Sequence, residues 1–134
     1  MEVTGPVTLR LWAISDAPDT DWTAKLAVVH EDGLAVNLTY GIMRARYRDG
    51  YDNPSLITPG SAYEYTVKLN PTGILFRTGQ RIRLYISSSD FPNFDRNHNT
   101  GRDYWSDTDL RIAHQTVLHD RDHPSRLVLP VIPR

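Results

Sequence analysis

Apolar and polar residues alternate with a period of two along most of this chain, which is the pattern of half-buried β-strands. Val7, Leu9, Leu11 and Ala13, for example, alternate with polar residues at positions 8 and 10. The pattern predicts strands at residues 7–14, 22–28, 34–40, 63–69, 82–86, 115–119 and 126–131. No segment shows a convincing amphipathic helix, so we expect an all-β fold, either a sandwich or a barrel.

Residues Gly41–Arg48 (GIMRARYR) suit a helix or a strand, and we favour a strand, which brings the total to about eight. Turn residues separate the strands, and Glu31–Gly33 predicts a hairpin between its two neighbours. The prolyl turn Asn70–Gly73 is expected to end the strand before it. Trp12 and Trp22 lie within the strand pattern, and we expect both in the core.

From Ser89 to about Ile112 the chain has no period and is rich in Asp, Asn and Arg. A long loop inside a compact domain usually serves a function or an interface. Trp105 lies in this stretch, so it is the tryptophan that we expect to be exposed or interfacial.

Composition narrows the class of protein. With 134 residues, the chain has the length of one domain and a single core, and its 40% hydrophobic content is typical of globular proteins. A net charge of -1 lacks the basic excess that nucleic-acid binding needs, and the absence of cysteine excludes disulfides and thiolate sites. We find neither a signal peptide nor an apolar run of about 18 residues that could cross a membrane. Cellular location and oligomeric state stay open.

The known hydrolase motifs are missing from the sequence. A serine hydrolase of the α/β type needs a Gly-x-Ser-x-Gly turn, and no glycine here is placed to form one. The Ser-x-x-Lys and His-Glu-x-x-His patterns are absent as well. We therefore expect no catalytic residue in this chain.

Two polar clusters have a metal-like spacing, and we interpret both as turns. Asp95, Asn97 and Asn99 offer oxygen atoms at alternate positions, but the glycine and glutamate that a calcium-binding EF-hand needs are missing. His119 and His123 are four residues apart, but a proline follows and no third zinc ligand has a defined spacing. We predict no metal and no other cofactor.

Arginine outnumbers lysine by thirteen to two, and thirteen aspartates are available as partners. The arginines form two groups, Arg44–Arg48 and Arg77–Arg83. Guanidinium groups favour fixed pairing with carboxylates at interfaces, so Arg44 and Arg46 are candidates for ion pairs with another domain. A solvated surface face explains the same composition equally well.

Several segments, in their order, resemble one known family. They are Ser15–Trp22 (SDAPDTDW), Gly41–Arg48, Gly79–Leu84 (GQRIRL), Ser87–Gly101 (SSSDFPNFDRNHNTG) and His123–Pro133 (HPSRLVLPVIP). Together they resemble the C-terminal non-catalytic domain of the X-prolyl dipeptidyl peptidase and cocaine esterase (CocE/NonD) type of serine hydrolases. Glutaryl acylases and α-amino acid ester hydrolases belong to the same family.

The resemblance implies a jelly-roll β-sandwich, similar to galactose-binding domains, over residues 1–134. It implies that the catalytic residues lie in an α/β-hydrolase domain, so the chain is expected to be part of a longer enzyme or a domain expressed alone. The domain would pack on that partner, help frame its substrate cleft and take part in homo-oligomer contacts. We expect the long loop to supply the docking surface, through Phe91, Phe94, Asp95, Arg96, Asn97 and Trp105.

The main alternative is an independent carbohydrate-binding module. It requires an exposed aromatic platform beside polar residues on a sheet face or loop cluster. A self-sufficient hydrolase is the third hypothesis, and the missing motifs weigh against it.

Overall fold

The computed structural model of the chain describes residues 1–133, so Arg134, the last residue of the expected domain, lies outside them. The elements are β1 (Glu2–Ser15), β2 (Asp21–Val29), β3 (Ala35–Arg44), the 3-10 turn η1 (Ala45–Tyr47), β4 (Ala62–Leu75), β5 (Arg81–Ser87), β6 (Gln115–Leu118), β7 (Arg126–Val128) and β8 (Val131–Ile132). The all-β prediction is confirmed. The described residues include no helix that is long and apolar enough to span a membrane.

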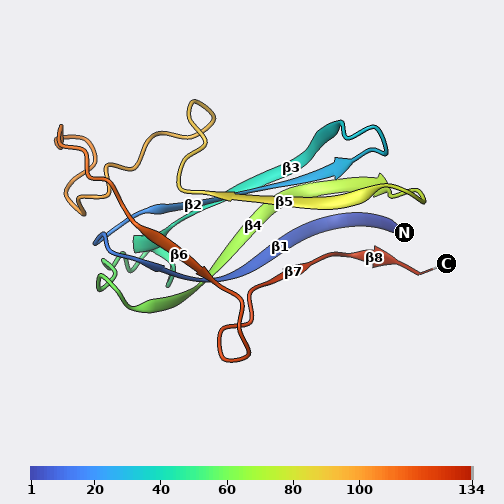
Figure 1. The fold of residues 1–134 in the computed structure, drawn as a ribbon. Helices are drawn as coiled ribbons and strands as arrows, with labels where there is room; N and C mark the ends of the chain where they lie inside the picture. The colour runs from blue at the N-terminus through green and yellow to red at the C-terminus, as the bar shows by residue number, and fades with distance from the viewer. Residues whose placement is uncertain (134) are drawn as a thin grey trace.

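The strands form two antiparallel sheets that share one core. In the first sheet, β1 pairs with β4 along one edge and with β6, β7 and β8 along the other. The second sheet has the order β3-β2-β5. The main core cluster contains residues of both sheets, for example Leu11 of β1 and Leu26 of β2. The long loop between β5 and β6 projects beyond one end of both sheets (Figure 1).

The alternation in β1 places its residues as predicted, with one exception. Val7, Leu9, Leu11 and Ala13 are at most 2% exposed, because their side chains all point into the core. Trp12 lies on the opposite face and is only half-buried, with its ring 5.1 Å from the ring of His123. The prediction that Trp12 lies in the core was therefore wrong. Its neighbours Leu11 and Ala13 point inward, so in an alternating strand Trp12 points outward.

Trp22 is in the core, as expected, because it is 3% exposed and its ring lies 5.7 Å from that of Tyr65. The predicted hairpin is confirmed by the pairing of β2 with β3. The turn Asn70–Gly73, however, does not end a strand, since β4 continues to Leu75. The register with β1 shifts at this point, and such a bulge accommodates a proline that cannot donate to the ladder.

Segment Gly41–Arg48 is divided between two structures. Its first half is the end of β3, as predicted, but its second half is the turn η1, so the strand prediction was wrong there. The turn forms because the amide of Ala45 donates to the carbonyl of Thr20 and the amide of Arg46 donates to the carboxylate of Asp19. A side chain that caps the backbone of a distant segment leaves no signal in hydrophobic periodicity.

Candidate functional site

Two buried aspartates lie where β1 leads into β2. Asp19 is in the connecting turn and Asp21 is the first residue of β2, and they are 0% and 1% exposed. Burying a carboxylate is costly unless it receives charged or hydrogen-bonding partners. Asp19 and Asp21 therefore need such partners close to their carboxylates.

Two arginines supply those partners. The guanidinium of Arg44 forms a fork on Asp21, with Nε 2.8 Å from Oδ1 and Nη2 3.1 Å from Oδ2. These residues are direct neighbours across β2 and β3. Arg46 binds Asp19 through Nε at 2.7 Å and through its backbone amide at 3.0 Å. The two predicted interdomain arginines thus have partners within the chain.

Asn97 connects the two carboxylates to the long loop. Its Nδ2 atom donates to Oδ2 of Asp19 at 3.1 Å and to Oδ1 of Asp21 at 2.8 Å. We call Asp19, Asp21, Arg44, Arg46 and Asn97 the carboxylate cluster. Because Asn97 lies within the loop of residues 88–114, the cluster holds that loop against the end of the sheets.

Burial raises the pKa of Asp21, and the hydrogen bonds from Arg44 and Asn97 act in the opposite direction. The hydrogen bond with Asp21 raises the pKa of Arg44, which therefore stays charged. The cluster is an ion-pair network whose members are mostly shielded from water.

Further contacts fix the loop on both sides of Asn97. Before it, Asp95 accepts a bond of 3.1 Å from Arg44, and the ring of Phe94 lies 5.9 Å from that of Tyr40. After it, Arg46 donates to the carbonyl of residue 102 at 3.2 Å. Arg111 donates to the carbonyl of residue 16 at 2.6 Å. The loop is therefore anchored to the sheets at several points although it contains no helix or strand.

The loop nevertheless presents large apolar side chains to solvent. Trp105 is 90% exposed and Phe91 is 64% exposed, while Arg96 lies over the Phe91 ring at 5.6 Å. Leu110 and Ile112 are 63% and 83% exposed, and sequence reasoning did not single them out. The sequence did contain a signal for these two residues. They are apolar residues in an otherwise polar loop, which has no core of its own to bury them.

The predicted loop residues thus divide into two groups. Phe91, Arg96 and Trp105 are on the surface. Phe94 is half-buried, and Asp95 and Asn97 hold the loop in place through Arg44 and the buried aspartates. A shallow groove of about 260 Å³ runs beside Arg96, Asn97, Leu110 and Ile112.

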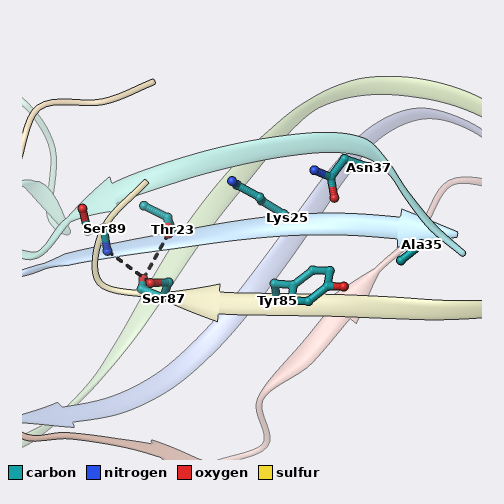
Figure 2. Close-up of a pocket in the computed structure, with 7 residues that line it drawn as sticks. All are labelled: Thr23, Lys25, Ala35, Asn37, Tyr85, Ser87 and Ser89. Atoms are coloured by element: carbon teal, nitrogen blue, oxygen red, sulfur yellow. Dashed lines mark hydrogen bonds between the residues drawn. The ribbon is translucent and has the colours of Figure 1, made fainter. Parts of the chain in front are cut away.

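A second groove, of about 460 Å³, lies on the outer face of the β3-β2-β5 sheet. Figure 2 shows that Thr23, Lys25, Asn37 and Tyr85 border it. The Thr23 hydroxyl donates to the carbonyl of residue 87 at 3.2 Å, so it is already satisfied. Tyr85 is 42% exposed and is the aromatic residue of this groove.

A family model described as the X-Pro dipeptidyl-peptidase C-terminal non-catalytic domain matches residues 1–128. The chain belongs to this family. The family description agrees with the expectation that this X-Pro dipeptidyl-peptidase C-terminal domain is not catalytic by itself.

Its relatives are hydrolases. The domain is 43% identical to cocaine esterase from Rhodococcus sp. (strain MB1 Bresler), covering 100% of this chain and 24% of that protein. A solved α-amino acid ester hydrolase superimposes with a TM-score of 0.90 at 26% identity, over 98% of this chain and 24% of that chain. An aminopeptidase from a marine sediment archaeon, Thaumarchaeota archaeon, gives a TM-score of 0.86 at 28% identity, with the same two coverages. The domain thus spans about a quarter of the length of these relatives.

Proposed function

We propose that this domain docks through its long loop on the α/β-hydrolase domain of a serine hydrolase that cleaves ester or amide bonds. Similarity to an esterase, an ester hydrolase and an aminopeptidase supports the reaction class. Four exposed apolar side chains on a loop that is held in place carry the docking proposal. In this position the domain helps to frame the substrate cleft.

The composition and the stiffness of the loop both suit an interface. Aromatic residues and arginine are enriched at the centre of protein interfaces, and Trp105, Phe91 and Arg96 provide that combination. A segment that is already ordered loses less conformational entropy when it binds. The carboxylate cluster would therefore contribute to affinity by ordering the loop in advance.

Arg44 and Arg46 would take part in this interface as well as in the cluster. Their side chains are 18% and 20% exposed, so an interdomain ion pair can form only in addition to the bonds with Asp21 and Asp19. Either arginine would then bridge a carboxylate of this domain and one of the catalytic domain.

The proposed architecture is a jelly-roll sandwich of the galactose-binding type, formed by residues 1–134 as one domain. The support is the presence of two antiparallel sheets on one core, with β1 and β4 long enough to run the full length of the first sheet. The proposal also includes homo-oligomer contacts.

The docking proposal is tested by titrating the domain with the separately expressed catalytic domain of its own enzyme, using isothermal titration calorimetry. Trp105→Ala and Phe91→Ala should each weaken binding by about 2–4 kcal/mol, or at least about 30-fold, as interface hot spots do. Leu34→Ala is the matched control, because Leu34 is 60% exposed in the β2–β3 turn at the opposite end of the sheets (Figure 1). Equal losses for Leu34 and Trp105 would contradict a specific docking loop.

A Gly-x-Ser-x-Gly turn encoded upstream of the Met1 codon would provide the catalytic serine that the proposal requires. An upstream reading frame without any hydrolase motif would argue against the assignment to a larger hydrolase.

Carbohydrate binding is the second candidate, favoured by the partly exposed Tyr85 beside Asn37 and Lys25 in the outer-face groove. Saturable chemical-shift changes at these residues, when galactose or glucose is added, would support it. Tyr85→Ala should abolish those changes.

A further inference from the structure

The two sheets are joined along one side only. There, β3 of the second sheet lies directly against β4 of the first. The Thr39 hydroxyl donates to the carbonyl of Asn70 at 2.6 Å. A Cβ atom on Gly41 would lie 2.2 Å from the carbonyl oxygen of Lys68, so the two backbones are in close contact. On this side the core is sealed.

The opposite side of the second sheet ends at β5, which pairs with β2 and has no strand on its other edge within residues 1–133. Ile82, Leu84 and Ile86 face inward, because their partners on β2 are core residues. Yet Ile82 is 40% exposed, and Leu84 and Ile86 are only half-buried. The apolar face of β5 is thus incompletely covered.

On the facing edge of the first sheet, apolar side chains are also incompletely covered. Val117 of β6 and Val131 of β8 pair with Ala13 and Val3 of β1, which are both 0% exposed. Their own side chains share that inward orientation but are 38% and 48% exposed. The core is therefore open to solvent between β5 on one layer and β6 and β8 on the other.

The outward face of β5 carries unpaired positive charge. Arg81 and Arg83 point away from the core, and neither forms an ion pair in the described part of the chain. Arg83 donates to the hydroxyl of Tyr85 at 3.1 Å. This contrasts with Arg44 and Arg46, whose guanidinium groups both bind carboxylates.

Edge strands that must stay unpaired are usually protected by charged side chains, an inward-pointing charge, a proline or a bulge. β5 has no proline, no bulge and no inward-pointing charge, and its two charges, Arg81 and Arg83, lie on the outward face, where they repel only a cationic partner strand. Its inward positions are isoleucine, leucine and isoleucine, and its ladder with β2 is regular over all seven residues. Both features favour pairing with a further strand.

We propose that a β-strand of alternating apolar and acidic residues, supplied by the rest of the parent enzyme, pairs with the free edge of β5. Its apolar side chains cover Ile82, Leu84 and Ile86, and its carboxylates face Arg81 and Arg83. The parent enzyme is the source because the domain spans only about a quarter of its relatives' length, so a long polypeptide is available next to it. The proposal concerns a different surface from the docking loop.

The test uses an eight-residue synthetic peptide in which valine and glutamate alternate, and a matched peptide in which valine and lysine alternate. Amide hydrogen exchange of residues 81–87 is measured with each peptide. We expect at least a tenfold slowing with the glutamate peptide and little change with the lysine peptide. The double variant Arg81→Glu/Arg83→Glu should reverse this preference. Arg121→Glu, in the exposed turn before β7, should leave it unchanged.

In the enzyme-length protein, the amides of β5 should already be protected and the glutamate peptide should not bind. Equal protection by both peptides, or by neither, would overturn the proposal. Protection of β5 that appears without peptide and grows with protein concentration would also overturn it, because a second copy of the chain would then occupy the edge. Failure of either kind leaves the loop-docking experiment unaffected, since that experiment uses Trp105 and Phe91.

Discussion

Replacing Arg44 with methionine measures how strongly the carboxylate cluster stabilises the domain. The change removes two hydrogen bonds, of 2.8 and 3.1 Å, from Asp21, which is 1% exposed and keeps only the bond from Asn97. Breaking a buried ion pair from one side costs about 3–5 kcal/mol. Because the Arg44 side chain is 18% exposed, water can reach the site, and we expect about 3 kcal/mol.

The free energy of unfolding is obtained from urea titrations followed by circular dichroism and by tryptophan fluorescence. At about 4 °C per kcal/mol for a chain of this size, the melting temperature should fall by about 12 °C. Arg126→Met is the matched control, since Arg126 is 53% exposed and lies 3.9 Å from Glu64, which keeps two bonds from Arg10, and such surface pairs contribute less than about 1 kcal/mol.

A double-mutant cycle separates the ion pair from other effects of Arg44→Met. Combined with Asp21→Asn, which removes the buried charge, it should cost about 2 kcal/mol less than the sum of the single changes. Strict additivity, or a cost for Arg44→Met no larger than for Arg126→Met, would refute a buried pair that stabilises this end of the domain.

Two other predictions concern the side where the sheets meet and the acid sensitivity of the fold. Gly41→Ala should destabilise the domain by about 3 kcal/mol in urea titrations, because its Cβ would collide with the β4 backbone, whereas Gly73→Ala, with 3.9 Å of space, should be tolerated. Hydrogen bonds led by the His123 amide lower the pKa of Asp120 in the folded state. Its stabilising effect is therefore present above the unfolded pKa of about 3.9 and is lost as pH falls through the folded pKa. Asp120→Asn should flatten the acid side of the profile of unfolding free energy against pH, measured by urea titration at each pH.

The alternation of residues predicted most strands because it depends on burial, which acts on every second residue. Val7 and Leu9 follow this pattern into the core, whereas Ile82, which belongs to the same kind of alternation, is 40% exposed. Periodicity states which way a side chain points but not whether another layer covers it. Whether β5 is covered depends on which strands lie next to it, and the sequence of β5 alone does not reveal that.

The carboxylate cluster was beyond sequence reasoning for a different reason. Arginine and aspartate numbers indicated fixed pairing, but the partner of Arg44 lies 23 positions away and that of Asn97 lies 76 positions away. An aspartate in a turn usually binds a backbone amide close by in sequence, but the amide that Asp19 accepts from belongs to Arg46. Pairings of this length depend on which strands become neighbours, and one sequence does not reveal that.

The bond from Asn97 to the buried aspartates divides the connection between β5 and β6 into two shorter segments, which meet along one groove. The entropy of closing a loop rises only slowly with its length, by about 0.6 kcal/mol for each doubling. An insertion among the exposed residues 91–93, ahead of the anchored Phe94 and Asp95, would therefore cost little and would leave the segment that carries Trp105 in place. Related enzymes could thus vary one half of this surface, for a new substrate or partner, while the other half keeps its shape.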